Sequence, residues 1–346
     1  MANLARERMA AQLLSGLRPS NPLDVVERLL AVQAQDPRGA RLAIRARSQG
    51  FTAVEIDRAL TRDRTLVISW LNRGTLHLVR SDDYPWLQAL TTPQLLAGNA
   101  RRLAQEGVTP EAADRGVAAI ERALGGEGPL TRDQLRGRIS AAGVRTEGQA
   151  LVHILALASR RGLIVRGPMA GRHQAFVLVR DWLGESAPID RESSLTELAR
   201  RYLVGHGPAD EHDLAKWAGI TIGDAVKGLR AIGSGLMQRA DGLLDVARRE
   251  PADGHPPPRL LGAYEPLLLG WRSRDDFVPS QKKRLIADNG LFRPFGLAGG
   301  RAVGTWSLRS GAVSLSPFEA LTPEVEAALA ADARDVVTFL GGAVDR

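Results

Sequence analysis

One sequence pattern occurs twice and constrains the fold more than any other feature. Residues 128–135 and 207–214 both read Gly-Pro-x-[Thr/Asp]-x-x-[Gln/Asp]-Leu. A Thr or Asp followed three residues later by Gln or Asp is typical of a helix N-terminus, where the side chains bind free backbone amides of the first turn. Each segment therefore predicts the start of a short helix, and the repetition predicts a chain built from similar units.

The same succession of elements follows each of these two segments. After the first, apolar spacing predicts a short helix, a second helix over 147–161, and a hairpin of 163–166 with 174–179. The elements expected after the second are a helix over 221–232 and hairpin strands 236–239 and 243–246. Helix, turn, helix and a two-stranded wing make up the winged-helix pattern.

A weaker copy of the pattern comes first in the chain. Asn21 and Pro22 start a helix that we expect to reach about residue 35. The later helices and hairpin strands of this copy are expected over 41–48, 52–60, 66–70 and 75–79. Small helical bundles share such signals by chance. Three occurrences, two of which start with the same Gly-Pro helix-start pattern, favour a repeated unit.

We therefore predict a mainly α, α+β chain with three tandem winged-helix units. These units are expected at residues 1–100, 101–185 and 186–250. Beyond a proline-rich segment at 251–258, alternating apolar, Gly and aromatic residues predict a β-rich subdomain over 259–346 that ends in a closing helix.

The composition narrows the class of protein. A formal net charge of +7 is the electrostatic footprint of a nucleic-acid partner. The absence of Cys excludes a disulfide framework, a zinc finger and a Cys nucleophile. The sequence has no apolar run long enough for a membrane span, no secretory signal, no metal-binding His motif and no P-loop. We therefore expect a cytoplasmic protein with no membrane partner, no metal and no cofactor.

The sharpest candidate site is the Gln-Ala-Gln-Asp-Pro segment at residues 33–37. Gln33 shares an apolar face of the first predicted helix with aliphatic residues, and Pro37 is expected to end that helix. A Gln on an apolar face must find hydrogen-bond partners or face a groove. Two interpretations stay open: Gln35 and Asp36 cap local backbone groups, or the polar side chains reach into a cleft.

Four separated motifs, in the same order, resemble the AlkZ/YcaQ family of DNA glycosylases. They are Gln-Ala-Gln-Asp-Pro at 33–37, Ser-Trp-Leu-Asn-Arg-Gly-Thr-Leu-His-Leu-Val at 69–79, Gly-Pro at 207–208 and Tyr-Glu-Pro-Leu-Leu-Leu-Gly at 264–270. The resemblance covers about residues 4–306. It is closer to the AlkZ branch, which carries Gln-aliphatic-Gln, than to the YcaQ branch, whose second polar residue is Asp.

The resemblance implies a fold, an activity and a partner. It implies winged helices that form a concave channel for double-stranded DNA, and excision of purines alkylated at guanine N7 or adenine N3. Bulky adducts and interstrand crosslinks are further substrates that the resemblance implies. Gln33 and Gln35 occupy the family's two catalytic positions, and Asp36 stands beside them as a supporting residue.

The chemistry of alkylated purines explains why two amides suffice. The alkylated base is a cationic leaving group, and its departure produces an oxocarbenium-like sugar. A Gln amide does not titrate near neutral pH, but it accepts a hydrogen bond from water and can hold that water beside the anomeric carbon. No Lys lies near the motif. We therefore expect a monofunctional glycosylase without a Schiff-base lyase step.

Basic side chains on or beside the first two hairpins are candidate DNA contacts. They are Arg73, His77, Arg160, Arg161, Arg166, Arg172 and His173. For each of them the other open interpretation is an ordinary solvated or structural side chain.

The alternative function is a non-catalytic winged-helix transcription regulator. Such a regulator has no need for two amides at one point of the fold, and the common design is a dimer that binds two half-sites. Three winged helices in one chain instead predict a monomer. We therefore favour an enzyme that acts on double-stranded DNA containing alkylated purines.

Overall fold

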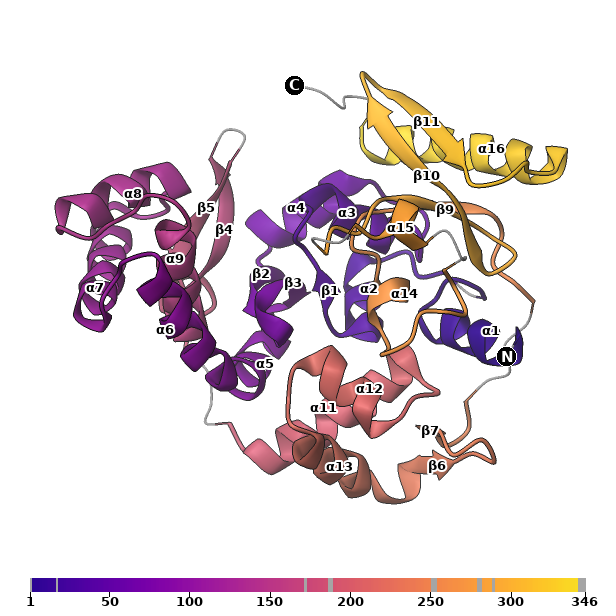
Figure 1. Ribbon diagram of the computed structural model, residues 1–346, viewed down its shortest axis with the longest axis horizontal. Coiled ribbons are helices and arrows are strands. Elements are labelled where there is room, and N and C mark those ends of the chain that lie inside the picture. Colours follow the sequence, from indigo (N-terminus) through magenta and orange to yellow (C-terminus); the bar gives the residue numbers. More distant parts are fainter. Residues whose placement is uncertain are drawn as a thin grey trace. The chain divides into compact units, whose positions relative to one another are not determined.

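Figure 1 shows a computed structural model of the chain, in which residues 2–16, 18–170, 173–185, 189–249, 254–278, 282–287 and 290–341 are described. The described chain is mainly helical and also contains antiparallel strands, which confirms the predicted α+β class. It forms two compact units. Unit 1 comprises Met1–Asp57, Leu195–Trp217 and Thr221–Arg346, and unit 2 comprises Arg58–Ser194 and Ala218–Ile220. Among the described residues, no helix is both long and apolar enough to cross a membrane.

The N-terminal part of unit 1 is helical. Its helices are α1 (Ala2–Ala11), α2 (Pro22–Leu29), α3 (Pro37–Arg45) and α4 (Ala53–Thr61), the last of which continues into unit 2. Helix α2 starts as predicted, because the Asn21 side chain accepts a hydrogen bond from the Leu23 amide at 2.9 Å and Pro22 is the first helical residue.

The predicted end of this helix near residue 35 was wrong. Helix α2 ends at Leu29 because Leu30 has a φ of 62°, a left-handed conformation that cannot continue a right-handed helix. The chain then runs extended through the short strand β1 (Val32–Gln33). Residues 29–34 are all buried, and a continuous buried run has no period that separates a strand from a helix.

The third predicted winged-helix segment has the expected elements in the expected order. They are α11 (Arg191–His206), α12 (Glu211–Ala218), α13 (Ile222–Ala231), β6 (Leu236–Gln238) and β7 (Leu244–Val246). Strands β6 and β7 pair antiparallel with Leu236 opposite Val246. At the start of α12, the Asp210 carboxylate accepts a hydrogen bond from the Asp213 amide at 2.7 Å, which is the predicted capping contact.

The C-terminal part of unit 1 contains the predicted β-rich region. A four-stranded antiparallel sheet has the order β11-β10-β9-β8, and helix α16 lies along it (Figure 1). The elements are β8 (Arg259–Leu261), α14 (Pro266–Leu269), α15 (Lys282–Leu285), β9 (Phe295–Ala298), β10 (Arg301–Arg309), β11 (Ala312–Pro317) and α16 (Pro323–Phe339). The Thr322 side chain caps α16, so the predicted closing helix is confirmed.

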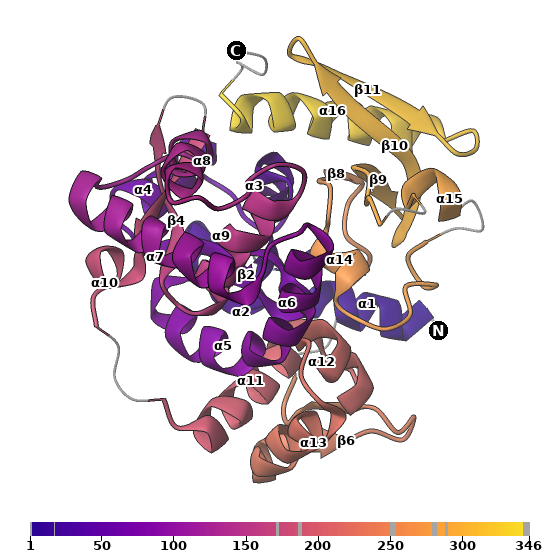
Figure 2. The same cartoon turned by 60° about the vertical axis from the view of Figure 1, so that its left-hand side comes forward.

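Unit 2 packs helices against strands that run in the order β3-β2-β4-β5, and Figure 2 brings several of these helices toward the viewer. The strands are β2 (Leu66–Leu71), β3 (Thr75–Arg80), β4 (Ile164–Ala170) and β5 (His173–Leu178). The helices are α5 (Tyr84–Thr91), α6 (Leu96–Gln105), α7 (Pro110–Glu127), α8 (Arg132–Ala141), α9 (Ala150–Arg160) and α10 (Val179–Trp182). Trp70 and Phe176 stack in the core with ring centroids 6.3 Å apart.

The predicted capping box at the start of α8 is confirmed. The Thr131 hydroxyl accepts from the Gln134 amide at 3.3 Å, and the Gln134 side chain accepts from the Thr131 amide at 2.8 Å. The helix, helix and hairpin that follow match the second predicted winged helix. The division into three units at residues 1–100, 101–185 and 186–250 stays a prediction. Along the chain, the first boundary between the two compact units falls inside α4, between Asp57 and Arg58.

Candidate active site and DNA-contact residues

The two glutamines lie in the segment that joins α2 to α3, Gln33 in the short strand β1 and Gln35 in the bend after it. Gln33 is 8% exposed, whereas Gln35 belongs to the exposed residues. The segment is therefore not the predicted helix: Gln33 is held in a strand, and Gln35 stands at the bend that leads into α3.

Asp36 caps helix α3. Its Oδ1 accepts hydrogen bonds from the backbone amides of Arg38, at 2.9 Å, and Gly39, at 3.0 Å, and Pro37 is the first helical residue. This is the capping interpretation that the sequence left open, although the cap belongs to the helix after the motif and not to the one before it. A carboxylate at this position satisfies free amides and is favoured by the helix dipole. The cap thereby fixes the backbone directly after Gln35.

The first turn of α3 packs tightly against the segment before α14. A side chain at Gly39 would collide with the carbonyl oxygen of Ala263, and one at Gly262 would come within 2.9 Å of the Gly39 Cα. Only glycine permits this approach. Tyr264 follows directly with a φ of 54°, and burial together with the Asp36 carboxylate raises the pKa of its hydroxyl. Sequence reasoning included Tyr264 in a family motif but did not place it beside Asp36.

A buried ion pair holds this segment in place. Arg47 and Glu265 form a salt bridge in which both side chains are 0% exposed. Arg47 also donates to the Gln12 side chain and to the Ala43 carbonyl, each at 2.8 Å. Gln12 Nε2 in turn donates to the Pro266 carbonyl at 3.3 Å. The network joins the segment after α1, the end of α3 and the start of α14, so it fixes the surroundings of the motif.

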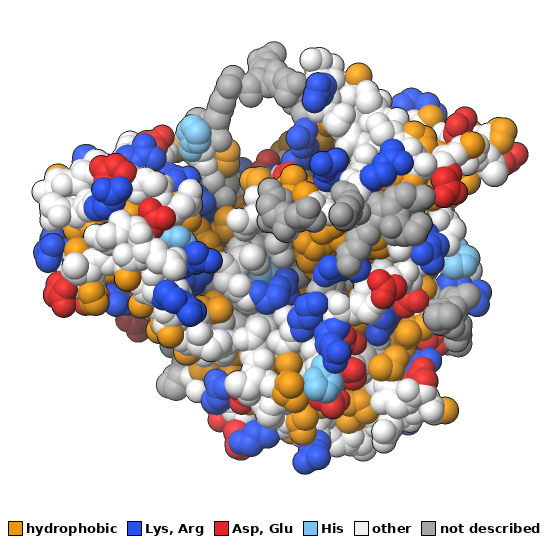
Figure 3. All heavy atoms as spheres, in the orientation of Figure 1, with side chains coloured by type: hydrophobic (Ala, Val, Ile, Leu, Met, Phe, Trp, Pro, Cys, Tyr) orange, Lys and Arg blue, Asp and Glu red, His pale blue; other side chains and the backbone are white. Residues whose placement is uncertain are grey.

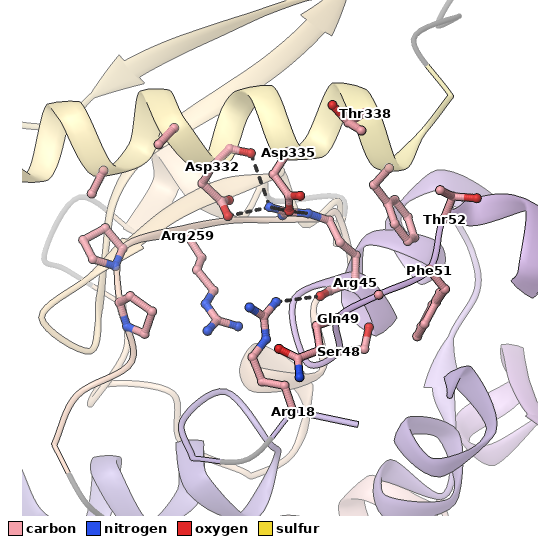
Figure 4. Close-up of a pocket in the computed structure, with 16 residues that line it drawn as sticks. Arg18, Arg45, Ser48, Gln49, Phe51, Thr52, Arg259, Asp332, Asp335 and Thr338 are labelled. Carbon is pink, nitrogen blue, oxygen red and sulfur yellow. Dashed lines mark hydrogen bonds and ion pairs between the residues drawn. The ribbon is translucent and has the colours of Figure 1, made fainter. Parts of the chain in front are cut away.

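The C-terminal end of α3 is fixed as well, at a pocket of about 500 Å³ shown in Figure 4. Arg45 bridges to Asp335 at 2.8 Å and to Asp332, both on α16. Arg18 donates to the Arg45 carbonyl at 3.3 Å, and Arg259 donates to the Ala46 carbonyl. Cations that bind the last carbonyls of a helix offset its dipole. Helix α3 is therefore held at both ends, with the candidate site at its N-terminus.

Two of the predicted DNA-contact residues lie together in unit 2. Arg73 is in the turn η1 (Asn72–Gly74) between β2 and β3, and Arg160 is in the last turn of α9. Both line one cavity, although 86 residues separate Gly74 from Arg160 in the sequence. The sequence did not identify the other basic residues of this cavity, which α6 and α9 supply.

Arg161 and Arg166 have different surroundings. Arg161 is exposed and forms a salt bridge with Asp114 at 2.7 Å. The Arg166 guanidinium lies over the rings of Phe176 and Trp70, at 4.2 Å and 5.5 Å from their centroids. Burial lowers the pKa of Arg166 to about 10, so it remains charged at neutral pH and packs as a cation on the aromatic core.

The remaining predicted contacts are at the second hairpin and in β3. His173 is exposed at the start of β5, and Arg172 lies outside the described residues. His77 is only 2% exposed, with its Nδ1 3.0 Å from the Thr75 carbonyl oxygen. Burial and the nearby Arg73 charge lower the pKa of His77 to about 3. A neutral, buried ring offers no charge to a phosphate, so His77 is not proposed as a DNA contact.

The buried His77 predicts an acid-sensitive fold. Its pKa lies below the ordinary value of 6.5 in the folded state, so protons bind more strongly to the unfolded chain. The stability that neutral His77 contributes is complete above pH 6.5 and is lost as the pH falls towards about 3. Urea unfolding of the wild type and of His77→Leu across this range should show a difference in unfolding free energy that shrinks with acid. His212→Leu, at a half-buried His, is the control. A difference that is constant with pH would contradict the prediction.

Basic side chains are also distributed widely. On the face in Figure 3, Lys and Arg side chains are spread over both units and do not gather in a single patch. Within the part of the chain that the structure describes, no group of three or more His, Asp and Glu residues is arranged to hold a metal ion.

Known proteins are similar to this chain in sequence and in fold. The model of the AlkZ-like DNA glycosylase family matches residues 26–339. The interstrand DNA cross-link repair glycosylase of Streptomyces sahachiroi is 27% identical over 339 residues, which cover 90% of this chain and 88% of that protein. The solved structure of the Streptomyces sahachiroi DNA glycosylase AlkZ has a TM-score of 0.80 at 24% identity, covering 98% of this chain and 96% of that one.

These comparisons confirm the resemblance that the four motifs predicted, and the structural match shows a shared fold. Because the matched protein family consists of enzymes, the alternative of a non-catalytic regulator is not retained. The family model extends over most of the chain and includes both glutamines. This chain belongs to the AlkZ-like family of DNA glycosylases.

Proposed function

We propose that this DNA glycosylase hydrolyses the N-glycosidic bond of N-alkylated purines in double-stranded DNA, such as N7-alkylguanine and N3-alkyladenine. The observation that carries the proposal is the position of two amides two residues apart directly before the capped start of α3, with Gln33 in strand β1 and Gln35 in the bend that follows it. Bulky adducts and interstrand crosslinks belong to the proposed substrates, since the Streptomyces sahachiroi relative is named as a cross-link repair glycosylase.

The proposed reaction needs little activation by the protein. The bond between C1′ and the purine nitrogen breaks, and its electrons neutralise the cationic alkylated base. Gln35 accepts a hydrogen bond from a water molecule and holds it beside C1′, whose positive charge the amide dipoles of both glutamines stabilise. The water oxygen bonds to C1′ and its proton leaves to solvent. The products are a free alkylpurine and an abasic site.

The exposed and buried glutamines suit different parts of this reaction. Exposed Gln35 has access to solvent and is the amide that we assign to the water. Gln33 is nearly buried, so we assign it the fixed position against the sugar. Asp36 anchors the backbone at the start of α3 and thereby positions the two glutamines. We therefore assign it the role of a positioning residue. No Lys occurs before Lys216, which favours a monofunctional enzyme.

The direct test is a base-release assay. The purified protein is incubated with duplex DNA containing N7-methylguanine, and the mixture is analysed for free base and for abasic sites that alkali cleaves. A duplex carrying a bulky adduct or an interstrand crosslink is the second substrate. Release of neither base would refute the proposed substrate class, whereas release from the crosslink alone would restrict it.

Binding to undamaged duplex is expected to weaken steeply with salt. Phosphate contacts by Arg side chains release counterions, so the logarithm of the binding constant falls by about 0.9 for each contact per tenfold rise in salt. Fluorescence anisotropy titrations at several salt concentrations measure this slope. A flat response would contradict a basic DNA-binding surface.

We further propose that the protein acts as a monomer in the cytoplasm, where its DNA substrate lies. Light scattering of the purified protein tests the proposed monomer.

A further inference from the structure

Unit 2 contains a basic cavity of about 690 Å³ between the η1 turn, helix α6 and helix α9. Its charged or titratable lining residues are Arg73, Arg101, Arg102, Arg160 and His153. The side-chain amides of Gln94, Asn99 and Gln105 also line it, and none of the described lining residues is Asp or Glu. Such a volume is within the usual range for a small-ligand site.

Arg160 is a half-buried cation that lines this cavity. One end of its guanidinium donates to the side-chain oxygen of Asn99, and Nη2 lies 3.5 Å from the Gly74 carbonyl oxygen. Asn99 is only 2% exposed and donates to the His153 carbonyl at 3.2 Å, so it holds Arg160 in a fixed position. Arg160 Nε is buried and has no hydrogen-bond partner among the described residues.

This arrangement of charge is costly without a ligand. Burial lowers the pKa of Arg160, and no carboxylate among the described residues offsets the effect. Burial is the main cause that lowers the pKa of His153. Glu106, which accepts from the Gln149 amide at 3.0 Å, raises this pKa, and the charges of Arg160 and Arg102 lower it. Like charges that converge on one cavity are stabilised by an anion placed between them. The planar guanidinium fork matches the oxygens of a phosphate group.

We infer that this cavity is a phosphate-binding site, in which Arg160 binds a phosphate oxygen and Arg73, Arg101 and Arg102 neutralise the rest of its charge. The shared chemistry is a phosphate oxyanion, and it has two sources: a backbone phosphate of duplex DNA or the phosphate of a free nucleotide. The first source rests on the proposed function, because it makes the cavity a second point at which the enzyme holds its DNA.

Gly98 of α6 allows a clean test. It lines the cavity, and a Cβ at this position meets no atom within 4 Å. Gly98→Glu therefore introduces a carboxylate among the arginines without a collision, and replacement of a helical glycine does not weaken the helix. Gly98→Gln is the neutral control of similar size. Gly223→Glu adds the same charge on exposed helix α13, where the Cβ has only an ordinary contact at 3.8 Å from Thr221 Oγ1.

The first arm measures binding to a short undamaged duplex. If DNA supplies the phosphate, Gly98→Glu lowers the affinity at low salt about tenfold and reduces the salt slope by about one. The two control variants remain within about twofold of the wild type. The second arm is calorimetric titration with inorganic phosphate and with deoxyadenosine monophosphate. If a free nucleotide is the ligand, it binds the wild type but not Gly98→Glu, and the duplex affinities stay equal.

The result that overturns the inference is a Gly98→Glu protein that behaves like Gly98→Gln in both arms. Base release by the wild type is measured separately and distinguishes this failure from failure of the proposed function. Release of alkylpurine together with no effect of Gly98→Glu would leave the excision proposal intact and remove the phosphate site. The opposite outcome, a Gly98→Glu effect on binding without base release, would support the phosphate site and remove the excision proposal.

Discussion

Replacing Gln35 by Ala is expected to slow release of an N-alkylated purine about 100-fold or more, with duplex affinity unchanged. Gln35 is exposed in the segment between α2 and α3, so loss of its side chain leaves the core and the Asp36 cap in place. The water that it holds would lose its position beside C1′, and positioning of this kind supplies a large part of the rate of such reactions. Single-turnover release kinetics, anisotropy and thermal melting measure the three quantities.

A matched control is available in the same unit. Gln49 is also an exposed amide, but it lies beyond the C-terminal end of α3, at the pocket of Figure 4. Gln49→Ala should leave release, affinity and melting temperature as in the wild type. Equal losses of release and of duplex affinity in Gln35→Ala would assign Gln35 a structural role and would contradict the proposed mechanism.

Replacing Arg47 by Ala is expected to lower the free energy of unfolding by about 3–5 kcal/mol. Arg47 and Glu265 are both fully buried, so the substitution leaves a carboxylate without its cation in the protein interior. It also removes the hydrogen bonds from Arg47 to Gln12 and to the Ala43 carbonyl. Urea unfolding followed by circular dichroism measures the loss.

Two further variants separate the buried ion pair from charge removal in general. Arg200→Ala breaks an exposed pair on α11, in which Arg200 is 49% and Glu197 is 42% exposed, and it should cost no more than about 1 kcal/mol. The double variant Arg47→Met, Glu265→Leu leaves neither charge buried, so it should be more stable than Arg47→Ala. A double variant that is less stable than Arg47→Ala would show that the pair contributes more than its desolvation costs.

Local signals predicted much of the fold. The Thr131 and Gln134 capping box, the β6–β7 hairpin and the capped closing helix α16 all depend on residues close in sequence, and all three are present. The end of α2 was not predictable in the same way. The buried segment from Leu29 to Ala34 has the same composition whether it is helical or extended, and the left-handed Leu30 carries no sequence signal that distinguishes it from an ordinary helical Leu.

The same distinction applies to the candidate site: local sequence identified the site residues, but it did not identify their neighbours in space. Gln33 was identified because a polar amide on an apolar face requires an explanation, and Gln35 and Asp36 because they stand beside it in the motif at 33–37 that resembles the AlkZ/YcaQ family. The position of Tyr264 beside Asp36 depends on the contact between Gly39 and Ala263, more than 200 residues apart. No pattern within one segment contains that information.

The amino-acid sequence alone determined where most helices and hairpins begin and which amides are chemically unusual. It also determined that the chain carries an excess of positive charge. Each of these follows from neighbouring residues or from counting residue types. Only folding in three dimensions decided that His77 is buried, that Arg166 packs on aromatic rings, and that Arg160 shares a cavity with basic residues of α6. The physical reason is that burial and clustering of charge depend on which distant segments pack together, and this is a property of the whole chain's packing and not of any local sequence.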